Sequence, residues 1–558
     1  MGSRTIYLET FGCQMNELDS ELVAGQLANL GYRFTDRADR ADVVLYNTCS
    51  VRENAEQKVW SRLGDLKKTK AVNPGLVVGV LGCMAERDGA GLMDRMPVVD
   101  VMCGPSELDK LPALIDNAVR TRESLVTADL PASEISAKES ALQGGASRRS
   151  GTLAAAGDSL EYLDLSRSVS PIDPVGSARR SAYVRITRGC NKFCTYCVVP
   201  FTRGAEIHRP PAHIIEECQR LADTGVTEIT LLGQTVNHYR FEHDSAVEVD
   251  GMTQPQKGRA FRGGHRRDPL AGDRVTTFAD LLYEIHERVP SVSRLRFVTS
   301  YPRDFGDDVL EVIRDCPRIC RYLHVPAQSG SDRILSLMNR GYSVGEYDEF
   351  VHRAREALDQ PEIGRPLMIS GDIIVGFPTE TDEDFAETVS LVERSRYKSC
   401  FIFKYSPRPG TVAIDKIPDD IPDDIKRSRN NALLSIQNRI SDEIGREQIG
   451  RTFDILIEGP SQRALKATGL SSRDAHRALG GVQLTIGGES AIRQSSDAVS
   501  MVLEHSDDDM VQFSGRTDGD QIVLFDVARD DARELPGSIR RVRIERSSGL
   551  SLFGSLLD

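Results

Sequence analysis

The stretch YVRITRGCNKFCTYCVVP, residues 183–200, carries three cysteines on a short loop that follows an apolar run. Cys190, Cys194 and Cys197 have the spacing C-x3-C-x2-C. Thiolates are the usual protein ligands of iron–sulfur clusters, and three of them on one tight loop can bind one face of a cubane. The fourth iron then stays free for a ligand that is not protein. The stretch therefore predicts a [4Fe–4S] cluster with one open iron.

A zinc site is the alternative interpretation of these cysteines. Structural zinc takes four protein ligands in a tetrahedral arrangement. The nearest histidine after the loop is His208, and no fourth cysteine or histidine stands at a typical zinc spacing. We therefore favour the cluster over zinc.

The loop resembles the signature of the radical S-adenosylmethionine superfamily, which has this spacing and an aromatic residue before the third cysteine. That aromatic residue is Tyr196 here. The resemblance implies that the open iron chelates S-adenosylmethionine through its amino and carboxyl groups. It also implies that Tyr196 lies near the adenine, and that the three cysteines of this loop are the catalytic ligands.

A second set of cysteines, in FGCQMN, NTCSVRE and LGCMAE, comprises Cys13, Cys49 and Cys83. Each follows a predicted strand, and the carboxyl ends of parallel strands gather at one edge of a sheet. We therefore expect the three to converge and to hold a second cluster. The alternative is that they are ordinary buried cysteines. This alternative is weaker, because all three cysteines stand at equivalent positions after a strand. Cys103 also ends a strand, and we assign it to packing.

The order of predicted elements indicates an α/β protein of several domains. Apolar runs at 5–8, 42–46, 76–81 and 98–102 alternate with helical patterns at 18–30 and 53–70, which is typical of βαβ units in a parallel sheet. We expect this N-terminal α/β domain to span 1–128. Residues 129–178 are rich in Ser, Ala, Gly and Asp, which predicts a flexible linker.

Six further strand candidates predict a partial (β/α)6 barrel over 179–446, with a polar insertion near 240–275. They are residues 183–187, 228–233, 294–299, 322–326, 371–375 and 400–405. The remainder is rich in β-formers, in FDILIEG, GVQLTIGG, VQFSG, QIVLFDV and SIRRVRIE. We predict a small C-terminal β-barrel over 447–546, with an insertion near 464–506, and a tail over 547–558.

Polar residues and glycine at the ends of the barrel strands are candidates for binding S-adenosylmethionine, because (β/α) barrels place their active sites there. The alternative for each is ordinary loop structure. The candidates are Gln234, Asn237, Ser300, Gln328, Asp372 and Gly376. Separately, Arg203, Arg209, Arg540, Arg541 and Arg543 are candidates for contacts to RNA phosphates. The segment FRGGHRR, residues 261–267, predicts a disordered loop.

The composition of the chain restricts the cellular location and the partners that we expect. The chain has 558 residues, 40% of them hydrophobic, eleven cysteines and a formal net charge of −13. We find no signal peptide and no uninterrupted apolar run long enough for a membrane span, so we expect a cytoplasmic protein with reduced cysteines and no membrane partner. The negative charge argues against a general nucleic-acid binder but leaves room for a local basic surface.

Two three-cysteine sets followed by a small β-barrel resemble the methylthiotransferases, whose parts are an N-terminal cluster domain, a radical S-adenosylmethionine barrel and a TRAM domain. The motifs FGCQMNELDSE, NTCSVRENAEQKV, RGCNKFCTYCVVPFTRG, LLGQTVNHY and YSPRPGT are similar to the MiaB-type branch, which acts on N6-isopentenyladenosine at tRNA position 37. Two positions depart from the family pattern: Thr379 replaces an expected glycine and Val412 an expected proline.

The resemblance implies a chemistry and its partners. A 5′-deoxyadenosyl radical from S-adenosylmethionine abstracts the hydrogen at C2 of the adenine, and the second cluster supplies an already methylated sulfur. The expected cofactors are two [4Fe–4S] clusters and S-adenosylmethionine. The expected partners are tRNA, a flavodoxin-like or equivalent electron donor and a sulfur source, and we expect a monomer.

Two alternatives stay open. The same chemistry could act on threonylcarbamoyl-adenosine in tRNA or on an aspartate of a ribosomal protein. A non-catalytic RNA-binding iron–sulfur protein is the alternative from another class.

Overall fold

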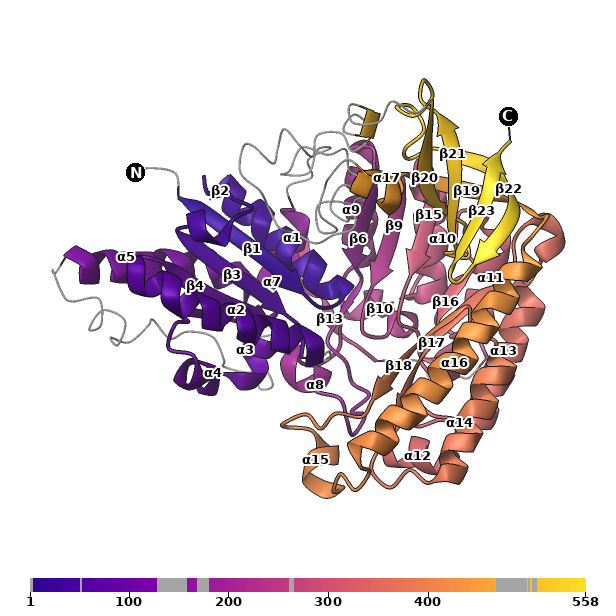
Figure 1. Ribbon diagram of the computed structural model, residues 1–558, viewed down its shortest axis with the longest axis horizontal. Helices are drawn as coiled ribbons and strands as arrows, with labels where there is room; N and C mark the ends of the chain where they lie inside the picture. Colours follow the sequence, from indigo (N-terminus) through magenta and orange to yellow (C-terminus); the bar gives the residue numbers. More distant parts are fainter. Residues whose placement is uncertain are drawn as a thin grey trace.

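The structure is a computed structural model that describes residues 4–50, 53–127, 158–167, 180–259, 265–467, 499, 502–503 and 509–557. An N-terminal α/β domain, a half-barrel of six parallel strands and a closed β-barrel follow one another along the chain (Figure 1). The expected fold class is therefore confirmed.

The N-terminal domain is built on one parallel sheet with the strand order β2-β1-β3-β4-β5. Ile6 and Leu8 face one apolar core and Tyr7 faces the other, because successive side chains on a strand point to opposite sides. The strands are β1 (Thr5–Phe11), β2 (Arg33–Phe34), β3 (Val43–Thr48), β4 (Val77–Gly82) and β5 (Val101–Cys103). The helices are α1 (Gln14–Asn29), α2 (Glu53–Val72), α3 (Cys83–Asp88), α4 (Ala90–Arg95) and α5 (Leu111–Thr127).

The half-barrel consists of two three-stranded parallel sheets, and a bridge between Leu295 and Ile319 connects them. The first sheet has β6 (Ser181–Arg185), β9 (Glu228–Leu232) and β15 (Arg294–Phe297), and the second has β16 (Tyr322–His324), β17 (Met368–Val375) and β18 (Ser399–Lys404). All six predicted strands are present. The longer helices are α9 (Pro211–Asp223), α10 (Phe278–Arg288), α11 (Asp307–Asp315), α13 (Val344–Leu358), α14 (Asp382–Ser395) and α16 (Asp423–Glu447).

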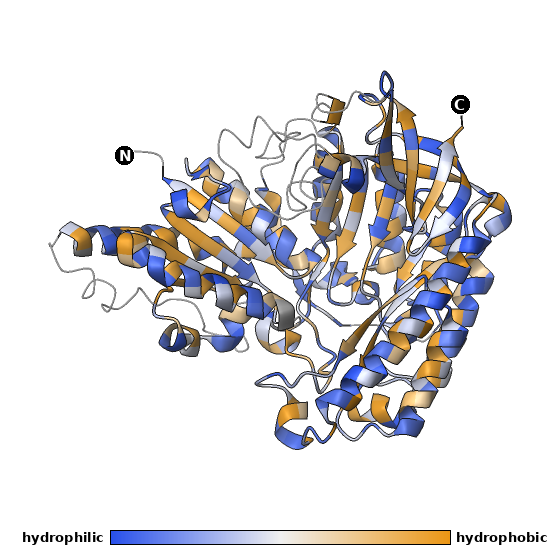
Figure 2. Cartoon of the chain, in the orientation of Figure 1, coloured by the Kyte–Doolittle hydropathy of each residue, from blue (hydrophilic) through white to orange (hydrophobic). Residues whose placement is uncertain are grey.

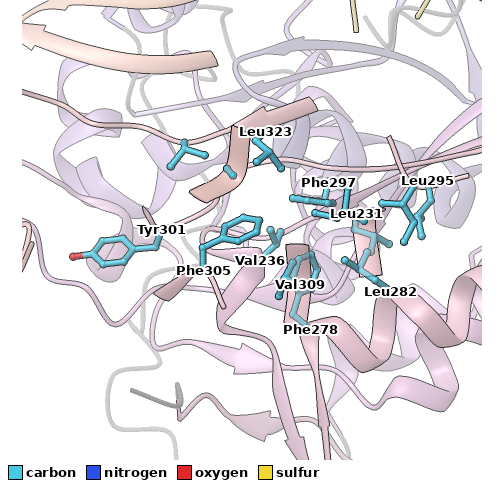
Figure 3. Packing of buried hydrophobic residues seen from close by; sticks show 14 of the residues in the cluster. Leu231, Val236, Phe278, Leu282, Leu295, Phe297, Tyr301, Phe305, Val309 and Leu323 are labelled. Atoms are coloured by element: carbon cyan, nitrogen blue, oxygen red, sulfur yellow. The ribbon is translucent and has the colours of Figure 1, made fainter. Parts of the chain in front are cut away.

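Apolar side chains of the strands pack against those of the helices in one continuous core. Figure 3 shows part of this core, where Phe278 and Phe297 meet edge to face with their ring centroids 5.1 Å apart. This buried layer fixes the strands, so the loops at their carboxyl ends are held on a rigid base.

The C-terminal barrel closes through five strands in the order β19-β20-β21-β23-β22. They are β19 (Thr452–Pro460), β20 (Met510–Arg516), β21 (Ile522–Ala528), β22 (Ile539–Ser548) and β23 (Ser551–Leu556), with α17 (Gln462–Ala467) after the first. The expected tail at 547–558 is wrong. β23 pairs with β21 and β22, and without it the barrel would keep an open edge. The segment GVQLTIGG lies outside the described residues.

The flexible linker expected at 129–178 is also wrong for residues 158–167, which contain helix α7 (Ser159–Leu165). The Asp158 side chain caps this helix by accepting hydrogen bonds from the backbone N–H groups of Leu160 and Glu161. Leu160 and Leu163 are buried in the core of the N-terminal domain. The rest of the expected linker lies outside the described residues.

Short antiparallel pairs occupy the described part of the insertion near 240–275. β10 (Arg240–Glu242) pairs with β14 (Val275–Thr277), β11 (Glu248–Val249) with β12 (Met252–Thr253), and β13 (Gln256–Lys257) with β8 (Ile207–His208). Residues 261–264 of FRGGHRR are not among those described. None of the described helices combines the length and the apolar character needed to cross a membrane.

Candidate functional site

The structure brings Cys13, Cys49 and Cys83 together at one edge of the N-terminal sheet. They follow β1, β3 and β4, which are neighbours in the sheet, so their carboxyl ends meet. Two glycines make the approach possible. A Cβ on Gly12 would lie 2.6 Å from the Cβ of Cys49, and Gly82 has φ +86° before Cys83. The sequence therefore places the three thiols correctly at a common edge.

Electrostatics distinguish these thiols. A hydrogen bond with the Cys49 thiol and the nearby Arg203 guanidinium lower the pKa of Cys13 to about 5 despite its burial. Burial raises the pKa of Cys83, although Arg203 opposes the shift. The Cys103 thiol lies within the apolar core and donates to the Glu107 carbonyl at 3.2 Å, which is consistent with a packing role.

Arg203 connects this edge to the half-barrel. It follows α8 (Val199–Thr202), which comes directly after the first cysteine loop and packs against α3, the helix that Cys83 begins. The Arg203 guanidinium donates to Asn16 Oδ1 at 3.1 Å and to Asp19 Oδ2 at 2.9 Å. One stretch of chain, 190–203, thus runs from one cysteine set to the other.

The Cys190–Cys197 loop is fixed by backbone contacts at several points. The Cys190 N–H donates to the Gly204 carbonyl at 3.2 Å, and the Cys197 N–H donates to the Cys194 carbonyl at 3.0 Å. Thr195 Oγ1 donates to the carbonyl of Leu337, the last residue of α12 (Asp332–Leu337), at 2.8 Å. These hydrogen bonds fix the shape of the loop.

Arg340 is a site residue that sequence reasoning missed. Its guanidinium donates to the Cys194 sulfur at 3.2 Å and to the Pro326 carbonyl at 3.3 Å. The same group lies 5.2 Å from the ring centroids of Tyr301 and Tyr342. The positive charge of Arg340 thus lies beside the loop, where it opposes the rise that burial causes in the pKa of Cys197. The motif MNRGY contains this arginine, but its sequence distance from Cys194 gave no indication that the two side chains meet.

The donor chemistry of both sets suits iron–sulfur clusters. All six cysteines are free thiols. Burial raises the pKa of Cys190 to about 11 and that of Cys197 to about 12, so their thiolates need a positive partner such as iron. In the described part of the chain, no three Cys, His, Asp or Glu side chains come close enough to share one metal ion. Thiols that bind different irons of a cluster are expected to be spaced more widely.

The candidates for binding S-adenosylmethionine divide into two groups. Asp372 and His324 form a pair at 3.1 Å on the half-barrel strands, Ser300 Oγ is buried with no hydrogen-bond partner among the described residues, and Gln328 adopts φ +74°. Gln234 lies half-buried after β9. These four candidates, Gln234, Ser300, Gln328 and Asp372, stay predictions, as does Tyr196, whose ring packs in a small apolar cluster beside the loop.

The other group has structural roles in the fold. The Asn237 amide donates to the Tyr301 carbonyl at 2.9 Å and accepts from its N–H at 2.8 Å, so it braces the loop after β15. Gly376 has φ +67°, and a Cβ there would lie 2.4 Å from Lys426 Cγ. Conformation and the nearby Lys426 thus both favour glycine here, and the roles of Asn237 and Gly376 in binding S-adenosylmethionine stay predictions.

The expectation that Arg203 and Arg209 contact RNA phosphates is wrong, because both side chains are buried in ion pairs. Arg203 is 8% exposed, and Arg209, at 0%, pairs with Glu161 at 2.9 Å and Glu217 at 2.8 Å. They belong to a buried ion cluster that joins α1, α7 and the half-barrel. Its members are Asp19, Glu21, Asp158, Glu161, Asp164, Arg167, Arg185, Arg188, Arg203, Arg209 and Glu217.

Asp19→Ala is expected to lower the free energy of unfolding by about 3–5 kcal/mol, because it leaves buried Arg185 and Arg203 without this partner. Urea denaturation followed by circular dichroism measures the change. Asp116→Ala, which breaks the exposed pair with Arg120, is the matched control and should cost at most about 1 kcal/mol. Equal effects of the two variants would contradict the buried role of Asp19.

Comparisons with known proteins place the whole chain in a family. Residues 5–104 match the model of the uncharacterized protein family UPF0004, and residues 184–392 match the radical SAM superfamily. A likeness to the solved radical S-adenosylmethionine methyltransferase TsrM from Kitasatospora setae has a TM-score of 0.44 and 13% identity, and covers 81% of this chain and 80% of that chain.

Curated relatives are much more similar. The tRNA-2-methylthio-N(6)-dimethylallyladenosine synthase of Rhodopirellula baltica is 39% identical over 553 residues, which cover 99% of this chain and 95% of the relative. The proteins of the same name from Aeromonas hydrophila and Porphyromonas gingivalis are each 40% identical and cover 82% and 83% of this chain, and 82% and 86% of their own lengths. The chain belongs to the family of tRNA-2-methylthio-N(6)-dimethylallyladenosine synthases.

Proposed function

We propose that this chain is a radical S-adenosylmethionine methylthiotransferase that converts N6-isopentenyladenosine in tRNA to its 2-methylthio derivative. The observation that supports the proposal best is the pair of three-cysteine sets on separate domains, joined by the one stretch 190–203. A single cluster would be enough for the cleavage of S-adenosylmethionine alone. Transfer of sulfur needs a second cluster, and the second set of cysteines lies beside the same stretch.

The chain's own residues then have assignable roles. Cys190, Cys194 and Cys197 would hold the cluster that binds S-adenosylmethionine, and Cys13, Cys49 and Cys83 would hold the other. When bound, these groups supply the radical and the methylated sulfur. Arg340 and Arg203 place one buried positive charge at each set. The rigid half-barrel holds the reacting groups in line and excludes water, which is the protein's part in cofactor chemistry.

Anaerobically reconstituted protein is expected to contain about eight irons per chain, from two four-iron clusters. It should also convert an N6-isopentenyladenosine stem-loop to the 2-methylthio product, which mass spectrometry of the nucleosides detects. About four irons in folded protein, or zinc bound at Cys13, Cys49 and Cys83, would contradict the proposal. Product on threonylcarbamoyl-adenosine RNA alone would support the sister activity instead.

The C-terminal barrel would capture tRNA through arginines on its outer face. On β22, Val542 and Ile544 are buried inside the barrel, whereas Arg541 and Arg543 are exposed. Neither of these two guanidinium groups makes an ion pair within the described ranges. Free cations on an exposed strand suit phosphate oxygens.

Arg541→Gln with Arg543→Gln is expected to weaken tRNA binding. The slope of log affinity against log salt should shrink by about 1 for each phosphate that the variant no longer neutralises. Filter binding at several salt concentrations measures both changes. Arg314→Gln, which removes an exposed arginine on α11, is the control and should bind like the wild type. An unchanged slope in the double variant would exclude a phosphate-binding role for these two arginines.

Point variants are preferable to removing the barrel, because the barrel shields buried charges of the half-barrel. Arg516 pairs with Glu228 at 2.5 Å, and Asp520 pairs with Lys398 at 3.0 Å. Deleting the barrel would leave Glu228 and Lys398 without these partners, so a truncated chain would report on folding as well as on tRNA binding.

The proposal also includes an electron donor, flavodoxin-like or equivalent, and a sulfur source. We place the reaction in the cytoplasm, where tRNA is available, and propose that one chain suffices, since both cysteine sets belong to it.

A further inference from the structure

The inner side of strand β18 carries two half-exposed aromatic rings. Phe401 is 50% exposed and Phe403 is 41% exposed, whereas their neighbours Cys400 and Ile402 pack against the core of the half-barrel. Helix α16 packs against this strand on the outer side, where Cys400 and Ile402 lie. Since successive side chains point to opposite sides of a strand, Phe401 and Phe403 point the other way, into the interior of the half-barrel.

The two rings form an ordered pair. Their planes are within 14° of parallel and their centroids are 6.4 Å apart. The His324 ring meets the Phe401 ring edge-on at 6.4 Å, and His324 is itself paired with Asp372 at 3.1 Å. Large exposed aromatic rings held in parallel are costly to leave in water and suit a flat apolar partner.

Strand register places this pair beside the first cysteine loop. Phe401 is opposite Asp372 on β17, and Phe403 is opposite Ile374. Ile374 packs against the apolar cluster that also receives Tyr196, the aromatic residue between Cys194 and Cys197. The ring pair is therefore continuous with the candidate site, on the same inner face.

The pair also lies on the accessible side of the half-barrel. β18 is the edge strand of its sheet, and in Figure 1 it is the strand of that sheet nearest the N-terminal domain. Arg408, four residues after the strand, pairs at 3.0 Å with Glu56 of α2 in that domain. The open edge thus faces the domain that carries Cys13, Cys49 and Cys83. Strand β18 is coloured mostly as hydrophobic in Figure 2, although it lies at this open edge.

We infer that Phe401 and Phe403 are a stacking platform for the target adenine of tRNA, flipped out of the anticodon loop with its isopentenyl group. This inference rests on the proposed function. Proteins that read single-stranded RNA stack unpaired bases on aromatic side chains, and enzymes that modify a base remove it from its stack. Adenine offers a flat aromatic face and its isopentenyl substituent is apolar, and both match this surface. The rings support it by their position on the inner face that continues to Tyr196, on the strand whose following loop pairs with the N-terminal domain.

The test uses the full-length, cluster-loaded protein and an anticodon stem-loop with N6-isopentenyladenosine at the target position. Phe401→Ala with Phe403→Ala should weaken binding by about 10-fold or more, since stacking contributes about 1–3 kcal/mol per base. A stem-loop with 2-aminopurine at the target position should be quenched by the wild type and less by this variant. Tyr283→Ala, which removes an equally exposed ring on α10, should behave like the wild type in both assays.

Three results would overturn the inference. The first is unchanged affinity and quenching in the double alanine variant, with iron content and thermal unfolding like those of the wild type. The second is full affinity in Phe401→Leu with Phe403→Leu, because that pair keeps apolar area but loses the flat rings. The third is a loss of S-adenosylmethionine affinity with RNA affinity intact. Conversion of the stem-loop by the wild type tests the proposed function separately, so failure of one is distinguishable from failure of the other.

Discussion

Replacing Cys194 by alanine is expected to reduce the formation of 5′-deoxyadenosine to the background level. Cys194 is the central cysteine of the loop that would hold the cluster for S-adenosylmethionine, and its sulfur accepts a hydrogen bond from Arg340 at 3.2 Å. Two thiolates cannot keep a cubane in the position that leaves one iron open. The variant should therefore yield neither 5′-deoxyadenosine nor methylthio product. Liquid chromatography of anaerobic, dithionite-reduced reactions measures both.

General misfolding is the competing explanation for that loss, because cluster binding is coupled to folding. Cys316→Ala is the matched control, since Cys316 is a buried cysteine outside both sets and directly follows α11. It should keep about eight irons and full activity, while Cys194→Ala should keep about four. Production of 5′-deoxyadenosine by folded Cys194→Ala protein would refute the assignment of this loop.

Replacing Cys49 by alanine is expected to abolish methylthio transfer but not the cleavage of S-adenosylmethionine. Cys49 follows β3 in the N-terminal domain, beside Cys13, and is far in sequence from the loop that binds the other cluster. The radical-forming site keeps its three thiols in this variant. It should still cleave S-adenosylmethionine under reductant, yet transfer no methylthio group to RNA.

The iron content of Cys49→Ala should again be about four per chain, and circular dichroism should match the wild type. Methylthio product from this variant would mean that the N-terminal set does not supply the sulfur. Loss of both activities with a native spectrum would mean that the two sites are not separable, since Arg203, which ends the stretch that begins at Cys190, pairs with Asp19 of the N-terminal domain.

The sequence was sufficient to predict the strands and helices that have a local periodic pattern of apolar residues. Six strands of the half-barrel and the convergence of Cys13, Cys49 and Cys83 followed from strand order alone, because parallel strands present their carboxyl ends at one edge. Helix α7 was missed because its acidic residues look like linker composition. Its stability depends on arginines distant in the chain, such as Arg185, which pairs with Asp164 at 2.6 Å.

The same reason explains the error over Arg203 and Arg209. An arginine in a sequence looks like a surface cation until its partners are known, and Asp19 lies 184 positions from Arg203. β23 was missed because Ser551–Leu556 is short and contains glycine, so only closure of the barrel identifies it as a strand. Contacts between distant segments cannot be predicted from the local sequence of either segment.

The departure at Thr379 has a structural consequence. Thr379 adopts φ +70°, a conformation that favours glycine, which is the residue the family pattern led us to expect there. Arg333 donates to its hydroxyl at 3.1 Å and to its carbonyl at 2.6 Å, and the Thr379 N–H donates to Asp420 at 2.7 Å. These bonds hold a conformation that is strained for a β-branched residue.

The most direct test of the central claim is mass spectrometry of tRNA nucleosides from a strain that lacks this protein. The account predicts that 2-methylthio-N6-isopentenyladenosine disappears and N6-isopentenyladenosine accumulates in its place. The wild-type chain should restore the product, and Cys49→Ala should not. An unchanged nucleoside profile, or selective loss of the 2-methylthio form of threonylcarbamoyl-adenosine, would contradict it.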